Sequence, residues 1–308
     1  MARSQKNKTY WINREHKALE KYIRDDEVLN KQCRTRLERA RRNIDKEISY
    51  FYSKYATDNN ITMTDARKSV SRFDVKEYSR KVKDIIKNKN LSEEAEQELK
   101  LYNATMKINR LEMLKSEIGL ELVDAFSDIE RDQEKALIKR GLDEYKRQAG
   151  ILGNTIKNPK KEVEIIVNGS FHNATFSNRI WGNLDNLKSE LDTILTQGII
   201  QGRHPHELSK LLRKRFDVSK SNADRLLRTE MAVVQTESQL RNFKENGFDY
   251  VEFVADVDCC EECAALDGEI IRISSAVVGD NIPPAHPNCH CSLIPIEESG
   301  NPKEWDFD

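Results

Sequence analysis

Five cysteine and histidine residues in the last fifth of the chain constrain its fold more than any other feature. Cys260 and Cys263 are separated by two residues, and His286, Cys289 and Cys291 follow about two dozen positions later. Two thiolates at positions i and i+3 can hold one ion from a single tight turn, and a histidine with one or two more cysteines can complete a tetrahedron around it. The pattern therefore predicts a zinc site.

The alternative interpretation is a reduced, buried cysteine cluster or a disulfide. Of the six cysteines only Cys33 lies outside this region. Residues 1–10 are polar and basic and lack the apolar segment of a secretory signal, so we expect a cytosolic setting in which stable disulfides are rare. Cys259 and His290 are further candidate donors, which leaves the ligand set open.

We expect a structural rather than a catalytic metal, because the candidate donors outnumber the four positions of a closed site. Four acidic residues lie near the candidate ligands, namely Asp256, Asp258, Glu261 and Glu262. They could act as general bases, but we interpret them as a solvated rim around the site. Short strands are predicted at residues 250–254, 271–273 and 293–296, with a turn at Asp267-Gly268. So small a β unit buries little apolar surface, and a metal would contribute to its folding.

Composition sets the class of the remainder. The 308 residues leave room for two or three domains, and 38% hydrophobic with 33% charged residues indicates a soluble chain with long exposed helices rather than a compact enzyme. Fifty-one basic residues against 52 acidic ones give a formal net charge of -1, so no global imbalance points to nucleic acid. No apolar run approaches the length of a membrane span.

The first 150 residues are predicted to be almost entirely helical. Apolar residues recur at helical spacing from Leu37 through Ile44 and Ile48 to Tyr55, which indicates one buried stripe. Further helix starts are predicted at Thr62 or Thr64 and at Ser92, and a long helical segment follows over residues 111–129. Gly141 and the segment 150–153 are expected to interrupt it near a domain boundary.

A basic run in this half could contact DNA phosphates without sequence preference. Its arginines are Arg34, Arg36, Arg39, Arg41 and Arg42. The alternative is a solvated face whose partners are Glu38, Asp45 and Glu47. Aromatic residues are not interleaved as a platform for single strands requires, so direct reading of sequence is not expected.

In the middle of the chain, residues 163–167 followed by Asn168-Gly169 are interpreted as the start of a hairpin. Helices are expected to resume at Trp181, to restart near Pro205 and to restart again with Ser219 as a cap.

The signals after residue 175 together resemble the phage Mu F-like family of minor head proteins, also called head morphogenesis proteins. The resemblance covers roughly residues 175–296. It rests on the Trp181 helix, the segment 197–202, Arg228-Thr229-Glu230, the Cys-x-x-Cys with Leu266-Asp267-Gly268, and the run from His286 to Cys291. His290 stands where the family commonly has a basic residue.

The resemblance implies a low-copy, portal-associated structural protein of a tailed-phage head that acts in head morphogenesis and in retention or delivery of packaged double-stranded DNA. It implies the portal protein as partner, with scaffolding and major capsid proteins as further candidates. The expected location is the interior of the virion head, after assembly in the bacterial cytoplasm.

The rival class is an enzyme or toxin-like effector of the ADP-ribosyltransferase type, in which Arg228, Thr229 and Glu230 would act. Three consecutive residues on a helix point about 100° apart and do not converge on one substrate atom. No glycine-rich phosphate loop, GxSxG elbow or HExxH helix is present. We therefore expect no catalytic residues. A zinc-ribbon regulator would need a second Cys-x-x-Cys and a basic reading surface, and the sequence has neither.

The sequence thus predicts a mainly α fold with a small β component, of the α+β class. We expect a charged helical domain over residues 1–150, then a hairpin with helices over 151–245. A small Cys/His β unit over 246–296 and a flexible acidic tail over 297–308 complete the chain.

Overall fold

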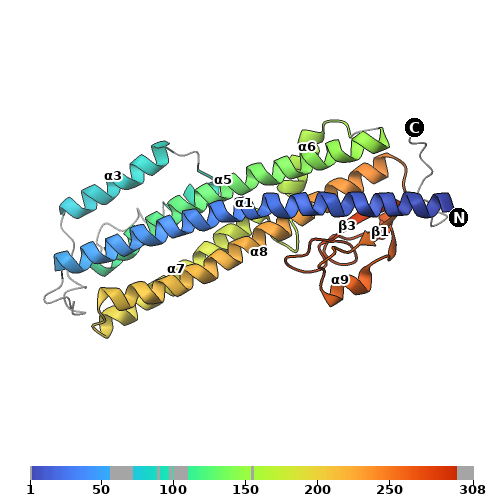
Figure 1. The fold of residues 1–308 in the computed structure, drawn as a ribbon. Helices are drawn as coiled ribbons and strands as arrows, with labels where there is room; N and C mark the ends of the chain where they lie inside the picture. The colour runs from blue at the N-terminus through green and yellow to red at the C-terminus, as the bar shows by residue number, and fades with distance from the viewer. Residues whose placement is uncertain are drawn as a thin grey trace. The chain divides into compact units, whose positions relative to one another are not determined.

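The structure is a computed structural model that describes residues 2–55, 72–88, 91–96, 99, 110–153 and 156–296. The described chain is mainly helical with one small antiparallel sheet, which confirms the α+β class (Figure 1). The helices that precede the sheet are α1 (Ala2–Tyr55), α3 (Arg72–Asn88), α5 (Arg110–Leu152), α6 (Pro159–Val167), α7 (Phe176–Ile200) and α8 (Pro205–Glu245). The C-terminal elements are β1 (Tyr250–Val254), α9 (Glu261–Leu266), β2 (Ile270–Arg272), a short 3-10 helix (Ile273–Ser275) and β3 (Ser292–Ile296).

The chain divides into two compact units, each assembled from segments that are distant in sequence. Unit 1 consists of Met1–Asn30, Gln133–Phe176 and Asp224–Asp308, and unit 2 consists of Lys31–Asp132 and Ser177–Ala223.

The sheet of unit 1 has the order β2-β1-β3, with both pairings antiparallel. Val251 in the central strand lies opposite Ile271 on one side and Pro295 on the other. The three strands predicted from alternating apolar residues are therefore confirmed. The predicted turn is also present, since Gly268 has a φ of 81° and its N–H donates to the Phe253 carbonyl at 2.9 Å.

The sheet packs into an apolar cluster that also contains helical residues of unit 1. Phe253 and Leu293 are fully buried there beside Phe243 of α8 and Trp11 of α1. Cys263, Cys289 and Cys291 belong to the same cluster. The cysteine-bearing loops are thus held against helices rather than standing apart from them.

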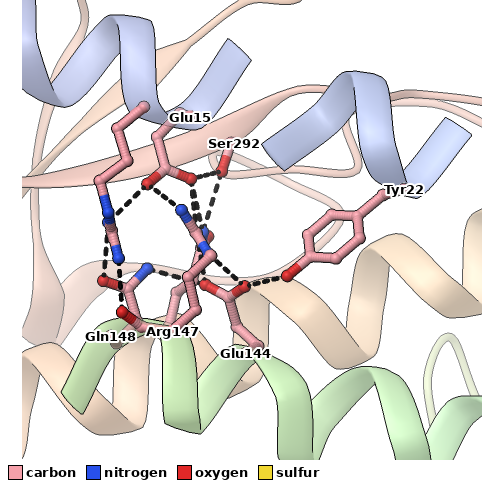
Figure 2. Close-up of polar contacts among 8 residues, drawn as sticks. Glu15, Tyr22, Glu144, Arg147, Gln148 and Ser292 are labelled. Carbon is pink, nitrogen blue, oxygen red and sulfur yellow. Dashed lines mark hydrogen bonds and ion pairs between the residues drawn. The ribbon is translucent and has the colours of Figure 1, made fainter. Parts of the chain in front are cut away.

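A buried polar network joins α1, α5 and β3 in unit 1 (Figure 2). Arg147 donates to both carboxylate oxygens of Glu15 at 2.7 Å and to Glu144 at 2.6 Å. Tyr22 donates to Glu144 at 2.7 Å, and Ser292 donates to Glu15 at 2.9 Å. Burial alone would raise the pKa of Glu144, but the Arg147 guanidinium and the hydrogen bonds lower that pKa to about 2. Both carboxylates are completely buried, and the Arg147 guanidinium bridges them, while Arg14 is a second partner of Glu15 at 3.1 Å.

Unit 2 contains the apolar stripe predicted on the first long helix. Leu37, Ile44 and Ile48 are fully buried on α1, as the helical spacing requires. The helix start predicted at Ser92 is confirmed, because its Oγ accepts the N–H of Ala95 at 3.3 Å. The start predicted at Thr62 or Thr64, and the tail at 297–308, lie outside the described residues.

The predicted hairpin at residues 163–167 is wrong, because this segment is the helix α6. Pro159 occupies the first turn, and Val163, Ile166 and Val167 are buried at helical spacing while Ile165 is 49% exposed. The apolar run therefore follows the helical period rather than strand alternation.

Two predicted helix breaks are also wrong. Gly141 lies inside α5, where an added Cβ would come within 2.8 Å of the Val163 side chain, so the glycine permits close packing of α5 on α6. Ser219 is buried inside the continuous helix α8 instead of capping a new one. Neither side of Ser219 carries a glycine or proline that would end the helix.

Candidate metal centre

The local structure of unit 1 places each predicted ligand in a turn or at the end of an element. Cys260 precedes the first turn of α9 and Cys263 lies within that helix, so one short helix presents both thiols. His286 and Cys289 belong to one tight turn, in which the Cys289 N–H donates to the His286 carbonyl at 3.1 Å and Asn288 has a φ of 69°. Cys291 directly precedes β3.

The structure brings all five predicted ligands into two groups that share Cys263. One group is Cys260, Cys263 and His286, and the other is Cys263, Cys289 and Cys291, with the ligand atoms of each group within 4.8 Å of one another. The chain therefore carries a Cys/His cluster that could hold a metal ion.

The distances between ligand atoms can be compared with a tetrahedral zinc site. The sulfur atoms of Cys263 and Cys289 lie 3.7 Å apart. Two sulfurs that each bind zinc at about 2.3 Å with a tetrahedral angle are about 3.8 Å apart, so this pair already has the required spacing. The Nε2 atom of His286 lies 3.1 Å from the sulfurs of both Cys260 and Cys263, which is about half an ångström closer than a tetrahedron needs. An outward movement of the imidazole by this amount would bring both Sγ–Nε2 distances to the tetrahedral value.

The orientation of His286 also suits a metal ligand. Its Nδ1 atom lies 2.8 Å from the carbonyl oxygen of Pro287, while Nε2 faces the two sulfurs. With the proton on Nδ1 donated to that carbonyl, Nε2 keeps its lone pair for an ion. A backbone carbonyl that fixes the tautomer in this way is the usual outer partner of a histidine ligand.

The thiols have unequal proton affinities. The backbone N–H of Cys263 lowers the pKa of Cys260, and the hydrogen bond from the Cys291 side chain lowers the pKa of Cys289 to about 6. Burial, together with the charge of Cys289, raises the pKa of Cys263. Burial alone would lower the pKa of His286, but the Pro287 carbonyl and the Cys289 and Cys260 thiolates raise it. A bound cation would favour the thiolate form of these cysteines and would displace their protons.

The two further donors considered from sequence are not brought into either group. Cys259 is half-buried, and His290 is half-buried with a pKa that burial and the nearby Arg228 charge lower. Among the acidic neighbours, Asp258, Glu261 and Glu262 are exposed. They form a solvated rim, as expected.

The Arg228-Thr229-Glu230 triplet lies on α8, and its side chains do not share one target. Arg228 pairs with Glu27 of α1 at 3.5 Å, and Glu230 is buried. The Thr229 hydroxyl donates to the Arg225 carbonyl at 2.8 Å and accepts the Asn288 N–H at 3.4 Å. Thr229 therefore contacts the turn that carries His286 and Cys289. Sequence reasoning missed this role, because no local signal links positions 229 and 288.

The basic run of unit 2 is engaged with carboxylates of its own unit. Arg36 binds Asp128 at 2.7 Å, and Arg39 lies 3.4 Å from the same carboxylate. Arg41 pairs with Glu38 and Asp45 at 2.5 Å each, two of the partners named for the alternative of a solvated face, but Arg41 itself is buried. The aspartates of α5 were missed, because their proximity depends on how the helices pack. DNA contact by this run stays a prediction.

Comparison with known families gives one match. Residues 189–294 match the model described as Phage Mu protein F like protein. This segment is a phage Mu F-like domain. The match contains the Arg228-Thr229-Glu230 triplet and all five clustered ligands, so the resemblance based on those motifs is confirmed. It supports a phage head morphogenesis protein.

Searches of the curated proteins and of the solved structures found no match. Among the described residues, no helix is both long enough and apolar enough to cross a membrane.

Proposed function

We propose that the chain is a minor head protein of a tailed bacteriophage, present in few copies, associated with the portal, and active in head morphogenesis and in retention or delivery of packaged DNA. The observation that carries this proposal is the phage Mu F-like match over residues 189–294, which contains the Cys/His cluster. The portal protein is the principal partner, with scaffolding and major capsid proteins as further partners. The protein assembles in the bacterial cytoplasm and resides inside the virion head.

In this proposal the Cys/His cluster binds one structural Zn²⁺. Cys260, Cys263, His286 and Cys289 are the best-supported ligand set, because each lies within 3.1 or 3.7 Å of another member. Cys291 supports Cys289 through the side-chain hydrogen bond that lowers its pKa. Bound zinc would fix the loop between β1 and β3 and add folding energy to the small three-stranded sheet.

Co-expression of the full chain with its cognate portal, scaffolding and capsid proteins tests the proposal. Quantified gels of purified procapsids should contain a few copies per particle, and omission of the portal should remove most of them. Incorporation that is unchanged without the portal would reject portal docking. Absence from procapsids under every condition would reject the role in the head.

The enzyme alternative has a separate test. Glu230 is buried and Arg228 is ion-paired, so we propose that this triplet has a structural role and no turnover of its own. An NAD-dependent transfer or nuclease activity of purified protein that Glu230→Gln abolishes, while the variant retains its fold, would favour the enzyme.

A further inference from the structure

Two contacts within unit 2 fix how α1 and α8 lie beside one another. The Ser209 hydroxyl donates to Asp45 at 2.8 Å, and the Lys220 ammonium donates to Glu38 at 2.9 Å. The residue number falls along α1 while it rises along α8 between these contacts. The two helices are therefore antiparallel here.

Two exposed cations of α1 lie to one side of this contact line. At about 100° per residue, Arg42 and Lys46 lie about 60° and 100° around α1 from Asp45, in the same rotational sense. The buried stripe that contains Ile44 lies in the opposite sense, so Arg42 and Lys46 face away from the core of the unit.

Two exposed cations of α8 lie on the same side. Arg213 and Lys210 lie about 40° and 100° around α8 from Ser209. Equal rotations on two antiparallel helices turn toward the same side of the pair. The four side chains Arg42, Lys46, Lys210 and Arg213 thus form one surface, here named the cationic face.

The charge of this face is not neutralised within the part of the chain that the structure describes. None of the four side chains forms an ion pair there, whereas Arg36, Arg39 and Arg41 of the same basic run do. Of the acidic groups beside the face, Glu38 and Asp45 bind Arg41, and Asp217 binds Lys220 at 3.1 Å. Within the basic run of residues 34–42, Arg42 therefore keeps a positive charge that can bind an external anion. Lys210 and Arg213 of α8 add two further charges to the same surface.

We propose that the cationic face is where the protein contacts the phosphate backbone of double-stranded DNA. This inference rests on the proposed function, because it locates the DNA contact of a head protein. Lysine and arginine on an exposed helical surface match closely spaced phosphates, and such contacts need no particular base sequence. An acidic protein partner fits less well, because protein interfaces are depleted of lysine at their centres and two of these four residues are lysines.

The test uses the full-length, zinc-replete protein and a labelled DNA duplex of random sequence. Binding is measured by fluorescence anisotropy over a series of salt concentrations. Each phosphate contact contributes about 0.9 to the magnitude of the slope of log association constant against log salt concentration. Replacing all four residues with Gln should therefore make this slope shallower by about 3 to 4. The affinity at low salt should fall at least about tenfold.

Two controls separate this surface from general charge. Four exposed lysines of unit 1, namely Lys157, Lys160, Lys161 and Lys244, are changed to Gln to give the same change in net charge. This control should bind DNA as wild type does. A variant that exchanges Arg for Lys and Lys for Arg at the four positions keeps the charge and should also keep the salt slope.

Equal reductions in the cationic-face and control variants would overturn the proposal, as would the absence of wild-type DNA binding at low salt. A cationic-face variant that binds DNA normally but no longer enters procapsids would assign the face to a protein partner and also overturn it. Portal-dependent incorporation is measured separately, so the proposed function can survive the failure of this inference. Circular dichroism of each variant confirms that its helices are intact.

Discussion

Ser292 donates a hydrogen bond of 2.9 Å to Glu15, which lies 277 positions earlier in the chain. Ser292 directly follows Cys291, and Gln239 of α8 donates to the same serine hydroxyl at 2.9 Å. The strand that leaves the Cys/His cluster is therefore tied to α1 and α8 by its first residue. A substitution that disrupts the Cys/His cluster should therefore also weaken the packing of α1 and α8 in unit 1, and the reverse should hold.

Metal content is the first prediction. Protein purified without added metal should contain about one zinc per chain by elemental analysis, and Cys263→Ser should lose it, because Cys263 belongs to both ligand groups. The unfolding of unit 1 should become easier by several kcal/mol, on the order expected when metal binding and folding are coupled. Proteolysis should then begin within residues 250–296 while the helices of unit 2 persist.

Cys259→Ser is the matched control for this prediction, because Cys259 adjoins the cluster but belongs to neither group. It should retain zinc and resistance to protease. Reduced, folded wild-type protein without zinc would contradict the structural-metal proposal.

The second prediction concerns the buried network. Arg147→Met should lower the free energy of unfolding by about 3–5 kcal/mol, because Glu144 would be left buried without this cation and Glu15 would lose its two-point partner and keep Arg14 at 3.1 Å. Urea denaturation followed by circular dichroism measures this change. Lys139→Met on the same helix removes a 71% exposed partner of Asp143 and should change the value by less than about 1 kcal/mol. Similar effects of the two substitutions would show that the network adds little.

The third prediction is a pH dependence. The pKa of Glu144 is about 2 in the folded protein, below the ordinary value of 4.5. The folded state therefore binds fewer protons than the unfolded state between these values. The contribution of Glu144 is complete above about pH 4.5 and is lost as the pH falls toward 2. Acid also protonates the cysteine and histidine ligands, so wild type must be compared with Glu144→Gln. The variant should be less stable near neutral pH, and its stability should decline less steeply below pH 4.5.

The fourth prediction compares two glycines of α7. An added Cβ at Gly198 would lie 2.2 Å from the Leu208 side chain, whereas one at Gly182 would have no atom within 4 Å. Gly198→Ala should destabilise the protein by about 1–3 kcal/mol through overpacking. Gly182→Ala should stabilise it by about 0.5–1 kcal/mol, because alanine favours the helix. Thermal unfolding of both variants provides the test, and shifts of the same sign would contradict it.

The sequence predicted local features well where one strong pattern operated alone. The strands around Val251 and Leu293 are short apolar segments that are buried along almost their whole length, and the spacing of the cysteines limits their ligand geometry. The prediction of a hairpin at residues 163–167 failed, because a short apolar run fits both the helical and the strand period. The packing of Val163 against α5 decides in favour of the helix. A helix that continues through Ser219 was missed because a capping residue does not by itself end a helix.

Pairings between distant segments could not be predicted in the same way. Two examples are the contact of Thr229 with Asn288 and that of Arg36 with Asp128. Both depend on how distant segments pack, and no periodic pattern in the sequence indicates them. The basic run was found as a composition feature, but the fold decides which of its charges stay exposed. Only the packed helices reveal that Arg42 shares a surface with Arg213.

The division of the chain into units sets an order of events during synthesis on the ribosome. Unit 2 is complete once residue 223 has emerged, whereas unit 1 needs both its α1 segment, made first, and β3, made almost three hundred residues later. In the newborn chain Glu15 can pair with Arg14 and then with Arg147, but it lacks the hydrogen bond from Ser292 until β3 has been made. Domains generally fold as units during translation. A nascent chain stalled before β3 should consequently hold a folded unit 2 and an unfinished unit 1, in which all five Cys/His residues are present but the strand that follows Cys291 is missing.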